Sequence, residues 1–138
     1  MPPTDAIHTA VKAALIKDGW TITADPYTIQ YEEVTLFADL GAERPVAAER
    51  GGEKIVVEAK SFLSPSPIQD LKVALGQYEI YRLILETTAP DRRLFLAIGD
   101  RVFGTFFQQK AIQHIIRHYN MLLVVVDLQS EEVLKWTS

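Results

Sequence analysis

Two acidic residues and a lysine occur in an order that suits metal-dependent chemistry on phosphate. Asp39 is predicted at the end of one strand, and Glu58 and Lys60 lie two residues apart in the next strand. Side chains at positions i and i+2 of a strand project from the same face, so Glu58 and Lys60 should lie side by side. If adjacent antiparallel strands bring Asp39 next to Glu58, the two carboxylates repel each other unless a cation lies between them.

Magnesium, or manganese in its place, is the cation that fits such a pair. Mg²⁺ usually binds through one or two protein carboxylates and completes its octahedron with waters and substrate phosphate. The backbone carbonyl of Ala59 is expected to join Asp39 and Glu58 as a third protein ligand. Lys60 would face the scissile phosphate, where it could orient or deprotonate the nucleophile or neutralise developing charge. The sequence therefore predicts Asp39, Glu58 and Lys60 as catalytic residues.

The alternative is that this pattern has no catalytic meaning. An Asp followed later by Glu-x-Lys arises readily by chance, and Glu58 with Lys60 would then be an ordinary solvent-facing pair. The neighbouring residues favour a site, because the apolar run Ile55–Val57 indicates a central strand. Charged side chains in a central strand are costly unless they are paired or used.

Gln77 and Tyr81 form a second candidate element, on the helix that follows the Glu-x-Lys strand. Their i, i+4 spacing places both on one helix face, where they could bind a substrate phosphate or orient Lys60. The alternative is that Tyr81 packs in a half-buried position and that Gln77 has no special partner.

The remaining polar candidates carry weaker signals. His114 and His118 have the i, i+4 spacing of zinc ligands, but no further ligand is evident and a solvated helix face is the simpler interpretation; His8 has no partner in the pattern. Arg44 and Arg92–Arg93 are candidates for phosphate contacts, with scattered surface charge as the alternative.

The hydrophobic pattern predicts one α/β domain over residues 1–138, a sandwich with a mixed sheet that has an antiparallel meander at one end and helix crossovers at the other. The expected elements are a helix near residues 4–19, strands at Trp20–Asp25, Thr28–Leu40 and Ile55–Phe62, a helix at Pro67–Thr88, a strand at Arg93–Gly99, a helix from Asp100 to Tyr119, and strands at Met121–Leu128 and Val133–Trp136. A loop or hairpin connection is expected at Glu43–Glu53.

The long helix at Pro67–Thr88 has a clear predicted start and an unusual distribution of apolar residues. Ser66 should cap the helix, with Pro67 in the first position and Gln69 as the partner of a capping box. Apolar side chains occur all around the predicted helix, which predicts that it is mostly buried against a sheet.

Composition limits the function classes. The formal net charge is −4 and the sequence pI is about 5.3, which argues against binding nucleic acid by bulk electrostatics. A role on nucleic acid would therefore need a local site, a bound cation or a partner subunit. The chain has no cysteine, and no secretion signal or apolar run long enough for a membrane span is evident. We therefore expect a cytoplasmic protein that does not act in a membrane.

Seven segments resemble the XisH family of cyanobacterial fdxN-element excision controlling factors. They are Ala14–Trp20, Ala38–Arg44, Val57–Phe62, Pro67–Lys72, Ala74–Tyr78, Phe106–Ala111 and Val125–Asp127. The family is similar in fold to the PD-(D/E)xK, restriction-endonuclease-like nucleases. By that resemblance Asp39, Glu58 and Lys60 take the core positions, and Gln77 with Tyr81 resembles the Gln-x-x-x-Tyr element of RecB-like members.

The resemblance implies a role in programmed DNA excision during heterocyst differentiation, with DNA, a site-specific recombinase and an XisI-like factor as partners. A homo-oligomer is also expected. One departure from the nucleases is visible: they often carry a Glu on the first helix, where this chain has His8-Thr9-Ala10.

Three hypotheses remain open from the sequence. The chain is an active metal-dependent DNA endonuclease or nickase, a nuclease-fold protein that no longer cuts and instead binds DNA or a partner protein, or a nuclease controlled by a partner that covers its site.

Overall fold

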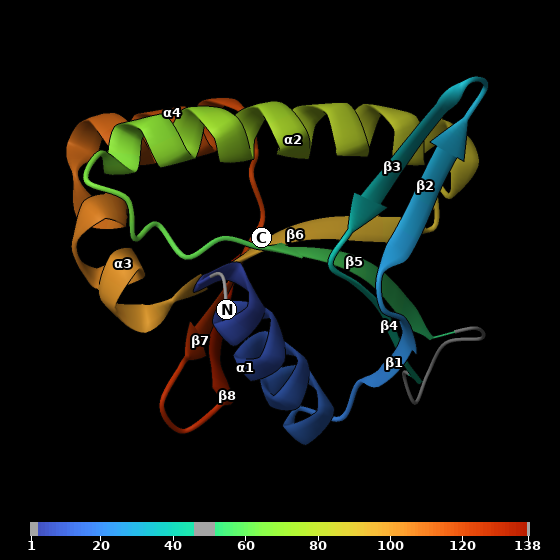
Figure 1. Cartoon of the computed structure of the whole chain (residues 1–138), viewed down its shortest axis with the longest axis horizontal. Coiled ribbons are helices and arrows are strands. Elements are labelled where there is room, and N and C mark those ends of the chain that lie inside the picture. Colours follow the sequence, from blue (N-terminus) through green and yellow to red (C-terminus); the bar gives the residue numbers. More distant parts are fainter. Residues whose placement is uncertain (1–2, 46–51, 138) are drawn as a thin grey trace.

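A six-stranded mixed sheet with helices on both faces forms the framework of the chain (Figure 1). The computed structural model describes residues 3–45 and 52–137. Its elements are α1 (Pro3–Lys17), β1 (Thr21–Ala24), β2 (Tyr27–Tyr31), β3 (Val34–Ala38), β4 (Leu40–Arg44), β5 (Glu53–Ala59), α2 (Pro67–Thr88), β6 (Arg92–Gly99), α3 (Asp100–Gly104), the 3-10 helix η1 (Phe106–Gln108), α4 (Lys110–His118), β7 (Leu123–Asp127) and β8 (Glu132–Trp136).

The strand order is β1-β4-β5-β6-β7-β8, and β5, β6 and β7 at its centre run parallel. The flanking pairs β1–β4, β4–β5 and β7–β8 are antiparallel. Parallel strands that are covered by helices on both faces are rich in buried aliphatic residues, as in the apolar runs of β5 and β7. The predicted α/β class with a mixed sheet is confirmed.

The two faces of β5 belong to two separate hydrophobic clusters. Val56 packs in the cluster beneath α2, whereas Val57 and Ala59 pack in the cluster that α1 covers. Because side chains alternate along a strand, Glu58 and Lys60 face the α2 layer and Ala59 faces α1. Ala59 therefore points away from its charged neighbours, into the cluster that α1 covers.

The segment predicted as one strand, Thr28–Leu40, is instead a hairpin followed by a third strand. The chain turns at Glu32–Glu33, where Glu32 has a φ of 52°, and β2 and β3 pair as a separate two-stranded sheet that rises to α2. The strand was expected to stop near Asp39, but after a bend there the chain continues as β4 through Gly41. Residues 46–51 of the predicted Glu43–Glu53 connection lie outside the described residues.

The predicted start of α2 is confirmed, since the Ser66 side chain accepts a hydrogen bond from the Gln69 backbone N–H and Pro67 opens the helix. The helix predicted from Asp100 to Tyr119 is three pieces, α3, η1 and α4, because the backbone leaves the helical conformation at Thr105 and is extended at Gln109. Phe107 and Ile112 are buried as expected, whereas Tyr119 is exposed.

The expectation that α2 is mostly buried against a sheet holds only for its inner face. Its inner face packs on the sheet through five buried side chains, Leu71, Ala74, Tyr78, Tyr81 and Leu85. Apolar side chains on the opposite face are exposed, because no other described element covers that side. No helix among the described residues combines the length and the apolar character that a membrane crossing needs.

Gly41 generates a test of this fold, because it is the point where β4 passes the β2–β3 hairpin. A Cβ at Gly41 would lie 2.7 Å from Cδ2 of Tyr27, whereas one at Gly104 would meet nothing within 4 Å. Gly41→Ala should therefore lower the free energy of unfolding by about 1–3 kcal/mol. Urea denaturation measures the change, with Gly104→Ala as the matched control. Equal stability of both variants would contradict the close approach of Tyr27.

Candidate metal and active site

Asp39 and Glu58 converge at the bend between β3 and β4. The antiparallel pairing of Leu40 with Val57 places Asp39 beside Glu58 on the neighbouring strand. The backbone N–H of Asp39 donates to Oε1 of Glu58 at 3.1 Å, and the backbone N–H of Ala59 donates to Oδ2 of Asp39 at 2.7 Å. Each carboxylate is therefore fixed by the backbone of the strand that carries the other.

Burial and mutual repulsion dominate the electrostatics of this pair. Glu58 is only 9% exposed. Its burial, followed by the negative charge of Asp39, raises the pKa of Glu58 to about 8, while the nearby positive charge of Lys60 opposes the shift. Near neutral pH Glu58 therefore holds a proton unless another cation takes the proton's place.

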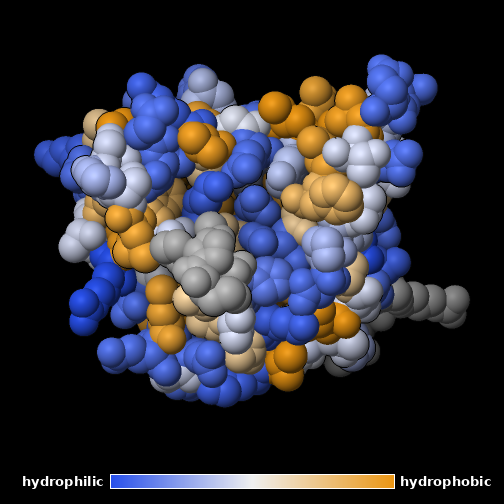
Figure 2. Space-filling model, in the orientation of Figure 1, coloured by the Kyte–Doolittle hydropathy of each residue, from blue (hydrophilic) through white to orange (hydrophobic). Residues whose placement is uncertain are grey.

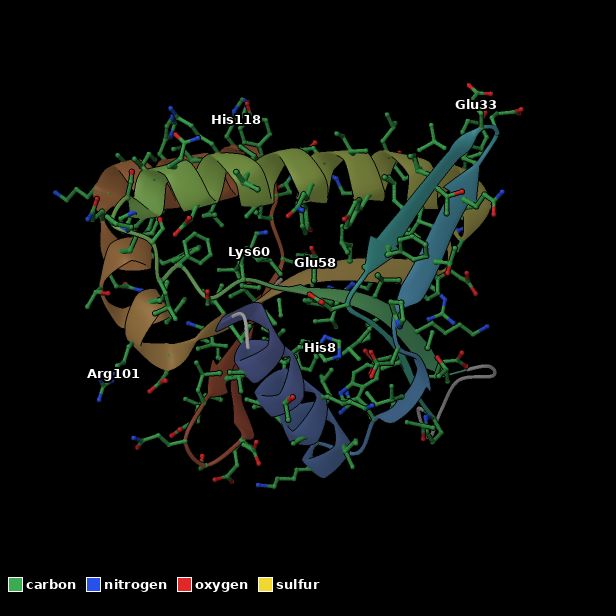
Figure 3. The ribbon with its side chains drawn as sticks, in the orientation of Figure 1. His8, Glu33, Glu58, Lys60, Arg101 and His118 are labelled. Carbon is green, nitrogen blue, oxygen red and sulfur yellow. The ribbon has the colours of Figure 1, made fainter. Side chains whose placement is uncertain are left out.

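Lys60 lies on the same side of the strand as Glu58, between the sheet and α2 (Figure 3). Its half-buried side chain lines a groove formed with Ser61–Ser64, Asp70 and Val73. Among the described residues its ammonium group makes no ion pair. The predicted clustering of Asp39, Glu58 and Lys60 therefore matches this geometry, with a cationic group that is free to act on a ligand in the groove.

The backbone of Ala59 completes the donor set. Its N–H points toward Asp39, and in an extended strand the carbonyl of the same residue points to the same edge. Within the part of the chain that the structure describes, no group of three or more His, Cys, Asp or Glu side chains is arranged to hold a metal ion. Two carboxylates and one carbonyl, with room left for water and phosphate, nevertheless fit the coordination that Mg²⁺ or Mn²⁺ favours.

Tyr81 and Gln77 of α2 have different surroundings. The Tyr81 hydroxyl donates to the carbonyl oxygen of Phe37 at 3.2 Å and so joins α2 to β3 two residues before Asp39. Burial raises the pKa of Tyr81 to about 12, with smaller contributions from the charges of Glu58 and Asp39. Oε1 of Gln77 is buried without a hydrogen-bond partner among the described residues, which leaves an acceptor available for a donor.

His8 is the site residue that the sequence pattern missed. Its Nδ1 lies 3.1 Å from Oδ1 of Asp39, and its Nε2 lies 2.9 Å from Oδ1 of Asp25. Lys12, one turn further along α1, binds Asp25 at 2.6 Å, and this hydrogen bond is the main reason that the pKa of Asp25 is lowered. The ring therefore orients Asp39 from the α1 side, as carboxylate–histidine pairs do around metals. The sequence signal for this cluster was the i, i+4 spacing of His8 and Lys12, which places both side chains on one face of α1.

The other candidates lie elsewhere. His114 and His118 are exposed on α4. Arg44 pairs with Asp18 and Glu53 and lies over the Trp20 ring, and Arg92 pairs with Glu43. These arginines have partners within the chain, which favours the surface-charge alternative over phosphate contacts.

Comparisons with known proteins add an independent finding. The sequence model of the XisH protein family matches residues 1–134. A crystal structure of an XisH family protein from Nostoc punctiforme is 39% identical, with a TM-score of 0.89, and the match covers 97% of this chain and 100% of that one. An fdxN element excision controlling factor protein from Anabaena variabilis is 41% identical, with a TM-score of 0.87 and coverage of 97% and 99%. No curated protein sequence matches.

The raised pKa of Glu58 predicts an unusual pH dependence of stability. The folded state retains the Glu58 proton after the unfolded chain has lost it, so without divalent ions the free energy of unfolding should fall as pH rises from about 4.5 to about 8. Glu58→Gln, a neutral isostere, should flatten this slope and raise the melting temperature at pH 8 by about 2 °C or more. Thermal scans in EDTA measure both effects, and identical slopes for the two proteins would refute the assignment.

Proposed function

We propose that this chain, which belongs to the XisH family, acts as a DNA excision controlling factor beside a site-specific recombinase and cleaves DNA phosphodiester bonds with Mg²⁺ or Mn²⁺. The observation that carries the proposal is the convergence of Asp39 and Glu58 with Lys60 on the same face of β5. Its relationship to the PD-(D/E)xK nucleases is part of the proposal, supported by a mixed sheet that offers these three residues where an antiparallel pair meets a parallel one.

Asp39, Glu58 and the carbonyl of Ala59 would hold the divalent ion. When bound, the ion supplies Lewis acidity and charge neutralisation to a phosphodiester group. Backbone hydrogen bonds fix both carboxyl groups, and His8 contacts Asp39 from α1. A pair of acids that is already held together loses little conformational freedom on binding.

Lys60 is the residue proposed to act on the substrate. Its side chain lies on the same side of the strand as Glu58 and lines the groove toward the start of α2, so a phosphate in that groove would lie beside a positive charge. It would orient the attacking nucleophile and stabilise the negative charge that develops on the phosphate. Gln77, which has a buried acceptor without a partner among the described residues, is proposed to bind a donor of the substrate, whereas Tyr81 holds the β3 backbone in place.

A second candidate function is a nuclease-fold accessory that binds DNA or a partner protein without cutting. The observation that favours it is His8, which occupies the first-helix position where related nucleases often carry Glu, so the core provides two acidic ligands. The net charge of −4 also makes unaided DNA binding weak, which would fit dependence on an XisI-like factor.

The metal site predicts proton release on binding. Titration calorimetry with Mn²⁺ at pH 7 in two buffers of different ionisation enthalpy should show that binding displaces the Glu58 proton. Asp39→Ala should weaken binding by about 100-fold or more, because one of two acidic ligands is lost. Asp91→Ala is the control, since Asp91 is exposed and pairs only with Lys54. Equal binding by wild type and Asp39→Ala would exclude the proposed ligands.

Cleavage is tested separately on supercoiled, linear and single-stranded DNA with the partner protein present. Lys60→Ala should reduce Mg²⁺-dependent nicking by about 100-fold or more while leaving the fold intact. Lys54→Ala is the matched control, because Lys54 lies on the same strand but pairs with Asp91. If wild type does not cut and Lys60→Ala supports excision as well as wild type does, the accessory function replaces the nuclease function.

A further inference from the structure

The outer face of α2 carries an exposed apolar stripe with a regular spacing. The stripe consists of Val73, Gly76, Ile80, Leu83 and Thr87, separated alternately by three and four residues. Val73, Ile80 and Leu83 are 47%, 54% and 67% exposed. Alternating three- and four-residue steps are the spacing with which one helix packs along another.

Further exposed apolar side chains lie near one end of the stripe. Figure 2 shows hydrophobic residues gathered along the upper right edge of the molecule, which Figure 1 places over the C-terminal half of α2 and the end of the β2–β3 hairpin. The hairpin contributes Tyr31 and Val34, which are also exposed. The stripe runs from Val73 to Thr87, which is about 21 Å of the 22-residue helix.

Gly76 in the middle of the stripe has no explanation within the chain. A Cβ added there would meet nothing within 4 Å, and its backbone does not have a positive φ. Glycine in the interior of a helix costs about 1 kcal/mol relative to alanine. A glycine at an exposed contact position does, however, allow the backbone of another helix to approach closely.

The charges beside the stripe indicate which helix would approach. Lys72, Glu79 and Glu86 follow one flank at seven-residue spacing. Arg82 pairs with Glu79 within the helix, but Lys72 and Glu86 have no ion-pair partner among the described residues. A second α2 in the antiparallel direction would bring Lys72 of each copy to Glu86 of the other, and it would set Glu79, which Arg82 pairs within each helix, opposite its counterpart.

We propose that two copies of this chain dimerise through the stripe, with their α2 helices antiparallel. Val73 then packs against Leu83 of the second copy, Gly76 packs against Ile80, and two Lys72–Glu86 pairs flank the contact. The interface is isologous, because the same patch serves both copies. The stripe contains no proposed metal ligand or catalytic residue, but Val73 also lines the groove of Lys60, so the proposed dimer lies beside the proposed nuclease site.

Sedimentation velocity of the full chain over roughly a hundredfold range of concentration tests the proposal. Wild type should form a dimer, and Ile80→Glu or Leu83→Glu should be monomeric at every concentration. Both side chains are exposed, so circular dichroism of the variants should remain that of a folded protein. A monomeric wild type, or a dimer that survives both substitutions, would overturn the proposal, and a complex formed only with a different protein would do the same.

Charge reversal tests the direction of the helices. Lys72→Glu and Glu86→Lys should each weaken the dimer by about fivefold or more, and the double variant should recover most of the lost affinity. Failure of the double variant to recover affinity would contradict the antiparallel arrangement.

Gly76→Ala separates folding from association. Below the dimer dissociation constant the substitution should raise the melting temperature, because alanine favours the helix. It should also weaken dimerisation by about tenfold or more, because the added methyl groups separate the two backbones. A higher melting temperature with unchanged dimer affinity would contradict close packing at Gly76.

Discussion

Two carboxylates that repel each other are held together by backbone hydrogen bonds across β4 and β5. The Asp39 N–H donates to the Glu58 carboxyl group, and the Ala59 N–H donates to the Asp39 carboxylate. These hydrogen bonds keep the two acidic side chains close together although their negative charges repel each other. Burial of Glu58 and the negative charge of Asp39 together raise the pKa of Glu58 to about 8. In the proposed function, a divalent ion between the two carboxylates would displace this proton and bind both groups as ligands.

The surrounding elements serve to keep this pair in place from three directions. Tyr81 fastens α2 to the β3 backbone, His8 reaches Asp39 from α1, and the parallel pairing of β5 with β6 fixes the strand that carries Glu58. These contacts come from segments far apart in the chain, so the site forms only when both helical layers are docked on the sheet. The outward face of α2 is exposed, and its Val73 also lines the groove of Lys60.

The sequence predicted those features of the fold and of the candidate site that depend on a single local pattern of residues. Ser66-Pro67 located the start of α2, and the Glu-x-Lys spacing within an apolar strand indicated the face of β5 on which the candidate site lies. The hairpin turn at Glu32–Glu33 was missed because it contains no Gly or Asn to mark a positive φ. His8 was missed because its contact with Asp39 spans 31 residues and depends on how α1 docks. The buried fraction of α2 was overestimated, because apolar residues occur around the whole helix whereas only its inner face packs on the sheet.

Anomalous X-ray scattering from a crystal grown with Mn²⁺ tests the central claim most directly, because it reports where an ion binds without reference to activity. The account predicts a peak between Asp39 and Glu58, at coordination distance from one oxygen of each and from the Ala59 carbonyl. A saturated crystal with no peak there, and with the two carboxyl groups still hydrogen-bonded as in the metal-free protein, would contradict it.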